Sequence, residues 1–178
     1  MTTDRTPIPL EPVLIEYGSS EFEMISTWNF IDPFVTRLLA TELPQRMMFG
    51  LCKVYIYSDP SGQPVGFGSM DLCRDYAEYT AGQLHPYLPL LALKPNIKSL
   101  GYGTTILRHL TDLATSEIVN NKLNHGLLFL DVYTTNHKAV ALYRTEGFSE
   151  VSSGPIVDEL EGGNTYIIMA KRVSVEFA

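Results

Sequence analysis

The sequence predicts a mixed α/β domain, on three observations. Stretches with apolar residues at three- and four-residue steps alternate with short runs of β-branched and aromatic residues, as when helices cross over between strands of one sheet. One run, Leu127 to Val132, is almost continuously apolar, which is typical of a central strand buried on both faces. The 178 residues, 45% of them hydrophobic, are enough for a single domain with its own core.

The first half of the chain is expected to contain a strand, helical pieces and a hairpin. Three prolines among the first twelve residues predict a disordered lead-in, and Pro33 should interrupt the helical periodicity that follows Glu21. The turn residues from Ser58 to Gly62 separate two extended runs and predict a β-hairpin. The expected elements are the lead-in over 1–11, a strand over Pro12–Tyr17, two helical pieces, and strands over Phe49–Tyr57 and Gln63–Leu72.

The second half alternates more regularly. A polar, tyrosine-rich segment from Arg74 to Gln83 precedes an apolar run that contains Pro89, and a proline inside a strand predicts a bulge or an edge position. Gly147 is placed to end a short helix. The expected elements are strands over Tyr87–Leu93, Leu127–Val132, Phe148–Val151 and Thr165–Val173, and helices over Gly103–Asn121 and Asn136–Glu146.

Composition excludes several classes of protein. The net charge of −7 disfavours nucleic-acid binding, which needs a basic surface, and allows a cationic partner. No apolar run is long enough for a membrane span, and the amino terminus lacks the pattern of a secretory signal. Cys52 and Cys73 lack metal-ligand spacing and are expected to be free thiols. We therefore expect a cytoplasmic protein without membrane attachment.

A glycine turn, Gly101-Tyr102-Gly103, lies between an apolar strand and an amphipathic helix. Backbone amides and the positive end of a helix together can bind an anion, although such a turn can also need glycine only for its backbone angles. Two nucleotide-binding motifs are excluded. Ile106 stands where a Rossmann fingerprint needs its third glycine, and Gly103-Thr104-Thr105 lacks the lysine of a P-loop.

A second pattern lies in the helix over Asn136–Glu146. Asn136 and Tyr143 are seven residues apart and share one face of a helix, with the small Ala139 between them. This spacing predicts a shallow groove along the helix. An ordinary core position for Tyr143, with its hydroxyl bonded to the backbone, is the alternative.

Together the two patterns resemble the GNAT superfamily of N-acetyltransferases. The family's phosphate-binding signature, Gln/Arg-x-x-Gly-x-Gly/Ala, is similar to Lys98-Ser99-Leu100-Gly101-Tyr102-Gly103. The later signature, Asn-x-x-Ala-x-x-x-Tyr-x-x-x-Gly-Phe, is matched at Asn136, Ala139, Tyr143, Gly147 and Phe148. The resemblance implies a mixed, mostly antiparallel central sheet flanked by helices, in a single GNAT-like domain over residues 12–178.

The resemblance also implies roles for individual residues, with acetyl-CoA as co-substrate and no metal. Backbone groups near Leu91 and Leu93 would bind the pantetheine arm and polarise the acetyl carbonyl. Asn136 would also bind the pantetheine, and Tyr143 would protonate the departing thiolate. The residues implied to hold the pyrophosphate are Lys98, Ser99, Leu100, Gly101, Tyr102, Gly103 and Thr104. Lys98 keeps a positive charge in place of the usual glutamine or arginine.

A base must deprotonate the acceptor amine, but the strand over Tyr87–Leu93 carries no carboxylate. His85 is the leading candidate, because its ordinary pKa suits proton transfer near neutral pH. Tyr133 is a weaker candidate than Tyr143 for the acid. The remaining candidates for the base are Glu78, Asp75 and Asp71.

The predicted function is transfer of an acetyl group to a primary amine of a small molecule, amino acid or peptide by direct attack. Two alternatives stay open: a coenzyme A-binding regulatory module without transfer activity, and acetylation of an amine on a protein or a tRNA. A homodimer is also left open. The aromatic residues that would line an acceptor pocket, unless they serve ordinary packing, are Tyr76, Tyr79, Tyr87, Trp28 and Phe34.

Overall fold

The computed structural model describes residues 9–30, 32–97, 101–123, 126–159 and 162–173. The predicted lead-in over 1–11 therefore lies outside the described residues except for its last three. The chain forms two compact units, the first from residues 1–68 and 90–109, the second from residues 69–89 and 110–178. Strands β3 (Pro64–Cys73) and β4 (His85–Leu93) and helix α5 (Tyr102–Asn120) contribute residues to both.

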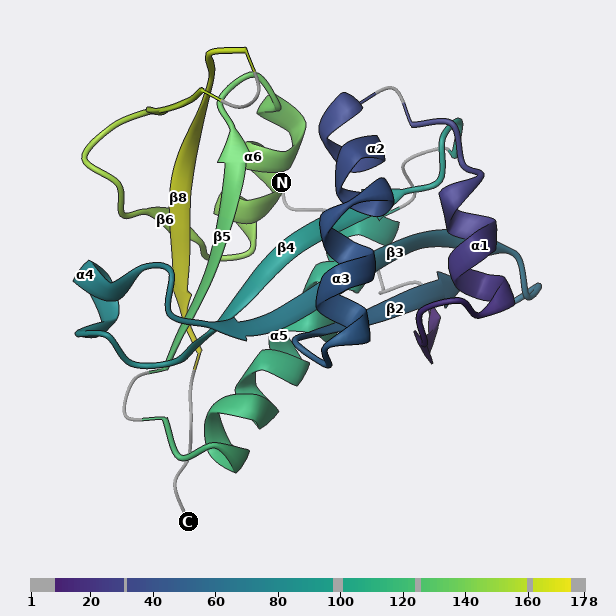
Figure 1. The fold of residues 1–178 in the computed structure, drawn as a ribbon, viewed down its shortest axis with the longest axis horizontal. Coiled ribbons are helices and arrows are strands. Elements are labelled where there is room, and N and C mark those ends of the chain that lie inside the picture. The colour runs from purple at the N-terminus through teal and green to yellow at the C-terminus, as the bar shows by residue number, and fades with distance from the viewer. Residues whose placement is uncertain (1–8, 31, 98–100, 124–125, 160–161, 174–178) are drawn as a thin grey trace, which may run out of the picture. The chain divides into compact units, whose positions relative to one another are not determined.

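In the first unit, three short helices precede a hairpin (Figure 1). The Ser19 side chain caps α1 by accepting the Phe22 amide at 3.2 Å, and Asp32 caps α2 by accepting the Phe34 amide at 3.0 Å. Helix α1 ends before Pro33 and α2 begins at it, so the expected interruption into two helical pieces is present; proline suits the first helical position because that position needs no amide donor. The elements are β1 (Glu11–Ile15), α1 (Ser20–Ser26), α2 (Pro33–Ala40), α3 (Glu42–Met48), β2 (Cys52–Ser58) and the start of β3.

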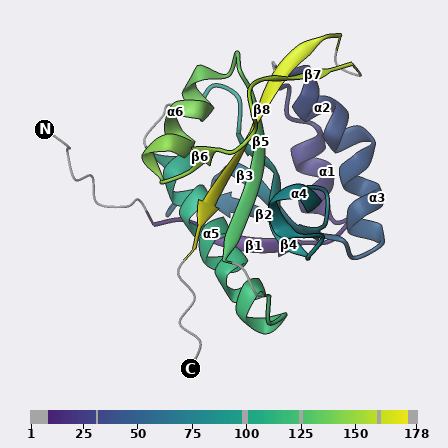
Figure 2. The same ribbon diagram turned by 90° about the vertical axis from the view of Figure 1, so that its left-hand side faces the viewer.

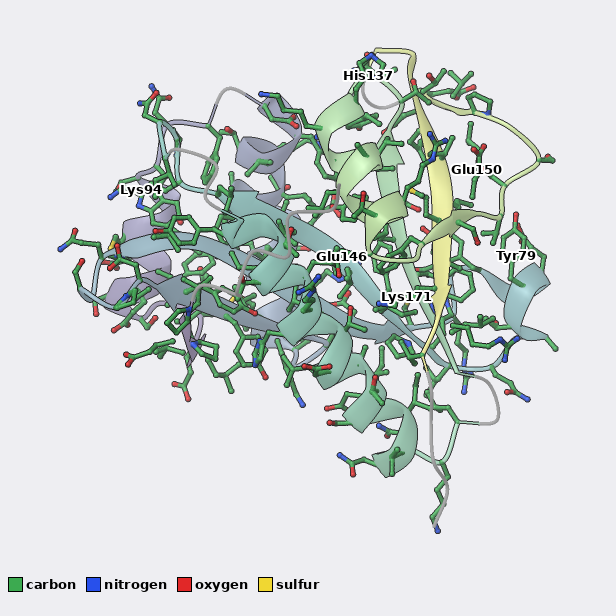
Figure 3. The ribbon with its side chains drawn as sticks, turned by 180° about the vertical axis from the view of Figure 1, so that it is seen from behind. Tyr79, Lys94, His137, Glu146, Glu150 and Lys171 are labelled. Atoms are coloured by element: carbon green, nitrogen blue, oxygen red, sulfur yellow. The ribbon has the colours of Figure 1, made fainter. Side chains whose placement is uncertain are left out.

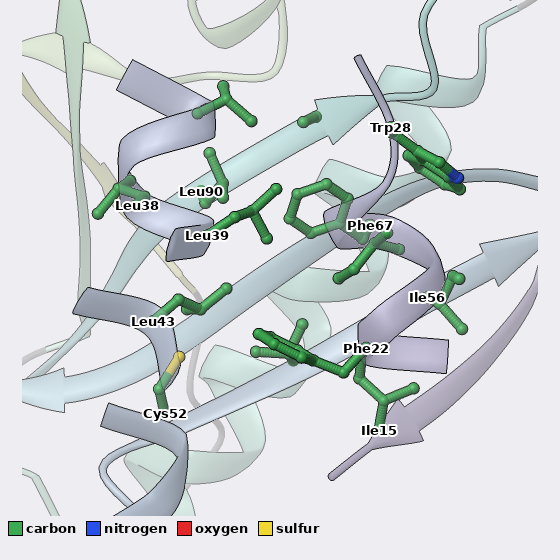
Figure 4. Packing of buried hydrophobic residues seen from close by; sticks show 14 residues of the cluster. Ile15, Phe22, Trp28, Leu38, Leu39, Leu43, Cys52, Ile56, Phe67 and Leu90 are labelled. Carbon is green, nitrogen blue, oxygen red and sulfur yellow. The ribbon is translucent and has the colours of Figure 1, made fainter. Parts of the chain in front are cut away.

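Helices α1, α2 and α3 lie on one face of β2 and β3, where a hydrophobic cluster fills the space between them (Figure 4). Phe67 of β3 is fully buried in this cluster, with its ring centroid 6.1 Å from that of Trp28. Its neighbour Gly66 points to the other face. A Cβ there would come within 2.8 Å of the Ala92 carbonyl oxygen and 3.0 Å of the Ile106 side chain, so only glycine fits between β4 and α5.

The second unit is built around β5 (Leu127–Tyr133), which has a neighbouring strand on each side (Figure 2). It pairs in parallel with β4 at Tyr87 and antiparallel with β8 (Asn164–Arg172) along its whole length. The central position predicted for this strand is confirmed. The remaining elements are α4 (Ala77–Thr80), α6 (His137–Thr145), β6 (Ser149–Glu150) and β7 (Ile156–Asp158), with β6 and β7 both paired to β8.

The predicted mixed, mostly antiparallel sheet with helices is confirmed, and the differences are local. The segment over Arg74–Gln83 includes the single turn α4, and Ile156–Asp158 forms a strand where the sequence predicted only a loop. That strand is three residues long, and its pairing with β8 stabilises it more than the strand propensity of its own residues does. Cys52 and Cys73 are free thiols, as predicted. Within the described ranges no helix has the length and apolarity to cross a membrane.

Candidate functional site

The predicted glycine turn lies in the first unit, where helix α5 starts. Gly101 has a φ of +91°, in the left-handed region, and its carbonyl accepts the first helical hydrogen bond from the Thr105 amide at 3.1 Å. The amides of the three intervening residues are those that a helix leaves without an internal partner, and the first turn holds no acidic side chain. A Cβ on Gly101 would meet nothing within 4 Å, so the turn is open. It can accept an anion; Lys98, Ser99 and Leu100 lie outside the described residues.

A pocket of about 360 Å³ in the first unit borders this turn. It lies between the β2–β3 turn and the segment that links β4 to α5. Its lining consists of Asp59, Gln63, Pro64, Val65, Lys94, Pro95, Asn96, Ile97 and Tyr102. Asp59 is committed to the hairpin turn, because its carboxylate accepts the Ser61 amide at 2.9 Å and the Gln63 amide at 3.0 Å. Lys94 is the basic residue of this lining, and its ammonium lies 5.6 Å from the centre of the Trp28 ring.

Strand β4 carries the residues expected to bind the pantetheine arm. Leu91 and Leu93 come after Pro89 in the strand, lie in the first unit and are half-buried. The alternate residues Leu90 and Ala92 belong to the hydrophobic cluster. Pro89 has no amide hydrogen, so it cannot donate to a neighbouring strand. Leu90 and Ala92 thus anchor this part of β4 in the core. The predicted pantetheine contacts concern the backbone of the same stretch, near Leu91 and Leu93.

Helix α6 of the second unit positions Asn136 and Tyr143. Asn136 is exposed and is the N-cap, where its side-chain oxygen accepts the Ala139 amide at 3.2 Å. Tyr143 is 9% exposed, its ring packs 5.9 Å from that of Phe148, and burial raises its pKa to about 12. Among the residues that the structure describes, its hydroxyl has no hydrogen-bond partner. The phenol is therefore protonated at neutral pH and keeps its proton available.

His85 is enclosed in the second unit and is 0% exposed. Its Nδ1 lies 3.1 Å from the Pro86 carbonyl oxygen, which can only accept, so Nδ1 carries the proton and Nε2 faces the Cys73 thiol at 3.7 Å. The rings of Tyr76 and Phe129 lie 5.5 and 4.5 Å away. Both nitrogens are thus engaged inside the protein.

The other predicted bases differ in exposure. Asp71 is 1% exposed in β3, while Asp75 and Glu78 are exposed on the segment before β4. The Cys73 thiol that faces His85 also has two of these carboxylates nearby: burial raises its pKa most, and the charges of Asp75 and Asp71 raise it further. The Tyr133 hydroxyl, the weaker candidate acid, donates to the Asp158 carboxylate at 2.9 Å.

The second unit also places among tyrosines a carboxylate that the sequence patterns did not single out. Asp131 of β5 accepts a short hydrogen bond from the Tyr76 hydroxyl and one of 3.0 Å from the Tyr87 hydroxyl. Burial raises the pKa of the Asp131 carboxyl, and the two hydroxyls oppose that rise. A single acidic residue inside the apolar run LLFLDVY was the available signal.

Comparisons with solved structures support the fold at low sequence identity. A spermidine N-acetyltransferase SpeG chimera from Vibrio cholerae and hSSAT is 18% identical with a TM-score of 0.66, over 92% of this chain and 95% of that one. The ribosomal-protein-S18-alanine N-acetyltransferase from Escherichia coli is 20% identical with a TM-score of 0.61, over 94% and 97%. AtaTR, solved with acetyl-CoA bound, is 18% identical with a TM-score of 0.60, over 88% and 91%.

Sequence comparisons give the family. An uncharacterized protein of Mycobacterium leprae (strain TN) is 30% identical over 108 residues, which are 58% of this chain and 28% of that protein. The chain thus spans less than a third of that relative. The model of the acetyltransferase (GNAT) family matches residues 19–148, a stretch that includes the glycine turn and helix α6. The chain belongs to the acetyltransferase (GNAT) family, whose enzymes transfer acyl groups from acyl-CoA to amines.

Proposed function

We propose that the protein transfers an acetyl group from acetyl-CoA to a primary amine of a small molecule, amino acid or peptide. The open turn at Gly101, with its unpaired amides and no acidic side chain in the first turn of α5, is the observation that carries the proposal. Residues 98–104 would hold the pyrophosphate there. Backbone groups near Leu91 and Leu93, and the side chain of Asn136, would bind the pantetheine arm.

The reaction proposed is direct attack. The amine nitrogen forms a bond to the acetyl carbonyl carbon as the carbon–sulfur bond breaks, the amine loses one proton, and the sulfur gains one. Tyr143 supplies the proton to sulfur, which its pKa of about 12 allows because the hydroxyl is protonated throughout the neutral range. His85 stays a prediction for the base; its burial means that a proton would reach it only through other groups.

Calorimetric titration of the protein with acetyl-CoA tests the first part of this proposal, and we expect saturable 1:1 binding. Transfer is then measured by coenzyme A release and by mass spectrometry of the acceptor, across alkylamines, amino acids, peptides, protein amino termini and aminoacylated tRNA. Absence of acetyl-CoA binding would overturn the proposal. Binding without turnover on any acceptor would instead establish a coenzyme A-binding regulatory module.

A further inference from the structure

One carboxylate of the second unit accepts two tyrosine hydroxyls. Asp131 lies near the middle of β5, partly exposed, and both of its oxygens accept a tyrosine hydroxyl, Oδ1 from Tyr76 and Oδ2 from Tyr87. A carboxylate has about four acceptor sites. The two hydroxyls therefore leave roughly half of its hydrogen-bonding capacity for another group.

The negative charge has no ionic partner in the protein as described. Within the described ranges Asp131 forms no ion pair. Lys171 of β8, labelled in Figure 3, has its ammonium 5.9 Å from the centre of the Phe148 ring. A partly buried carboxylate is normally paired with a cation, because hydroxyls alone do not neutralise its charge.

Aromatic rings surround this carboxylate. The Tyr76 ring lies 5.3 Å from that of Phe129 and 5.8 Å from that of Tyr87. The ring of Tyr79, which is labelled on α4 in Figure 3, lies 6.1 Å from that of Phe129. Burial, and then the charges of Asp131 and Asp158, raise the pKa of Tyr166. Ring faces attract cations, most strongly where water is partly excluded.

We propose that the cluster of Tyr76, Tyr87 and Asp131 binds an alkylammonium group of the acceptor. The ammonium would donate to the two free acceptor sites of the carboxylate, and its alkyl chain would pack against the rings. This inference rests on the proposed function and adds the charge class of the acceptor. Tyr87 belongs to β4, the strand that also carries Leu91 and Leu93.

The test is a titration of the protein without acetyl-CoA, with n-butylammonium chloride as the probe. The carboxyl carbon of Asp131 and the ring signals of Tyr76 and Tyr87 are followed by NMR on selectively labelled protein. We expect saturable shifts at constant ionic strength, and no such shifts with n-butanol, which has a similar chain and no charge. Equal shifts with n-butanol, or no shifts with either compound, would overturn the proposal, and this measurement needs only the wild-type protein.

Two variants distinguish binding of n-butylammonium by the Asp131 carboxylate from attraction by the net negative charge of the chain. Asp131→Asn should raise the dissociation constant of n-butylammonium about tenfold or more, because the ammonium loses its ionic partner. Asp158→Asn is the matched control, since Asp158 also accepts a tyrosine hydroxyl, and it should leave the constant within twofold. Equal weakening by both variants, or by neither, would overturn the proposal.

Failure of the cation site and failure of the proposed function give different experimental results. Acetyl-CoA binding and transfer with no loss of n-butylammonium affinity in Asp131→Asn would refute the cation site and leave the enzyme intact. Loss of acetyl-CoA binding in the wild-type protein would refute the proposed function, whatever the amine titration shows. Tyr87→Phe, which keeps the ring and removes one hydroxyl, should retain measurable n-butylammonium binding.

Discussion

The Tyr87 hydroxyl of β4 donates a hydrogen bond to the Asp131 carboxylate of β5 across 3.0 Å. The Tyr76 hydroxyl donates to the other oxygen of the same carboxylate. These contacts join the segment before β4 to the centre of the second unit's sheet. They also hold both hydroxyls protonated, since burial and the nearby negative charge raise the pKa of each phenol.

The first prediction concerns the pH dependence of stability. Burial, and less strongly the charge of Asp75, raise the pKa of Asp131 above 3.8, while the hydroxyls of Tyr76 and Tyr87 lower it by less. The folded state therefore binds the proton more tightly than the unfolded state. Stability from this group rises as pH falls through the raised pKa and is complete below 3.8.

Thermal unfolding of the wild type and Asp131→Asn between pH 7 and pH 4 measures this effect. The melting temperature of the wild type minus that of the variant should increase as the pH is lowered, since asparagine does not titrate. Asp112→Asn, at an exposed position of α5, controls for the lost charge. A wild-type advantage that shrinks on acidification would contradict the raised pKa.

The second prediction concerns the acid. Tyr143→Phe should lower kcat about 10²-fold, because general acid catalysis by a positioned group contributes at least that much. Acetyl-CoA affinity should persist, since the ring and its packing on Phe148 remain. Tyr133→Phe is the matched control, and its kcat should stay within a few-fold of the wild type. A larger loss in Tyr133→Phe would transfer the acid role to that residue.

The third prediction separates backbone strain from ligand binding. Gly101 and Gly62 have φ values of +91° and +80°, and a Cβ on either would meet nothing within 4 Å. Alanine at either position should cost about 1 kcal/mol, or roughly 2–4 °C in melting temperature, through the left-handed backbone alone. Only Gly101→Ala should also weaken acetyl-CoA binding by calorimetry. Equal affinities in the two variants would remove Gly101 from the proposed phosphate site.

The fourth prediction concerns thiol reactivity. Burial raises the pKa of the Cys73 thiol to about 12, so the reactive thiolate is scarce at pH 7.5. Cys52 is 8% exposed. Iodoacetamide should therefore modify both residues slowly in the native protein and rapidly in guanidinium chloride, as followed by mass spectrometry. Fast native labelling of Cys73 would show that its contact with His85 opens readily in solution.

Helix α5 and strand β5 were predictable because their signals are local. The sequence predicted a helix over Gly103–Asn121, and α5 spans Tyr102–Asn120. A long apolar stripe that begins at a glycine turn indicates a helix without knowledge of what packs against it. Strand β7 was not predictable. Its three residues are too few to show the alternation of apolar and polar side chains that indicates a strand. They form a strand because they pair with β8.

The same division holds for the candidate site. Sequence alone determined the glycine turn and the spacing of Asn136 from Tyr143, because both depend on residues close together in the chain. Only the tertiary structure decided that His85 is enclosed and that Asp131 meets Tyr76 and Tyr87. Those two tyrosines lie 55 and 44 positions before Asp131, so the folding of the chain, and no local pattern, brings the three side chains together.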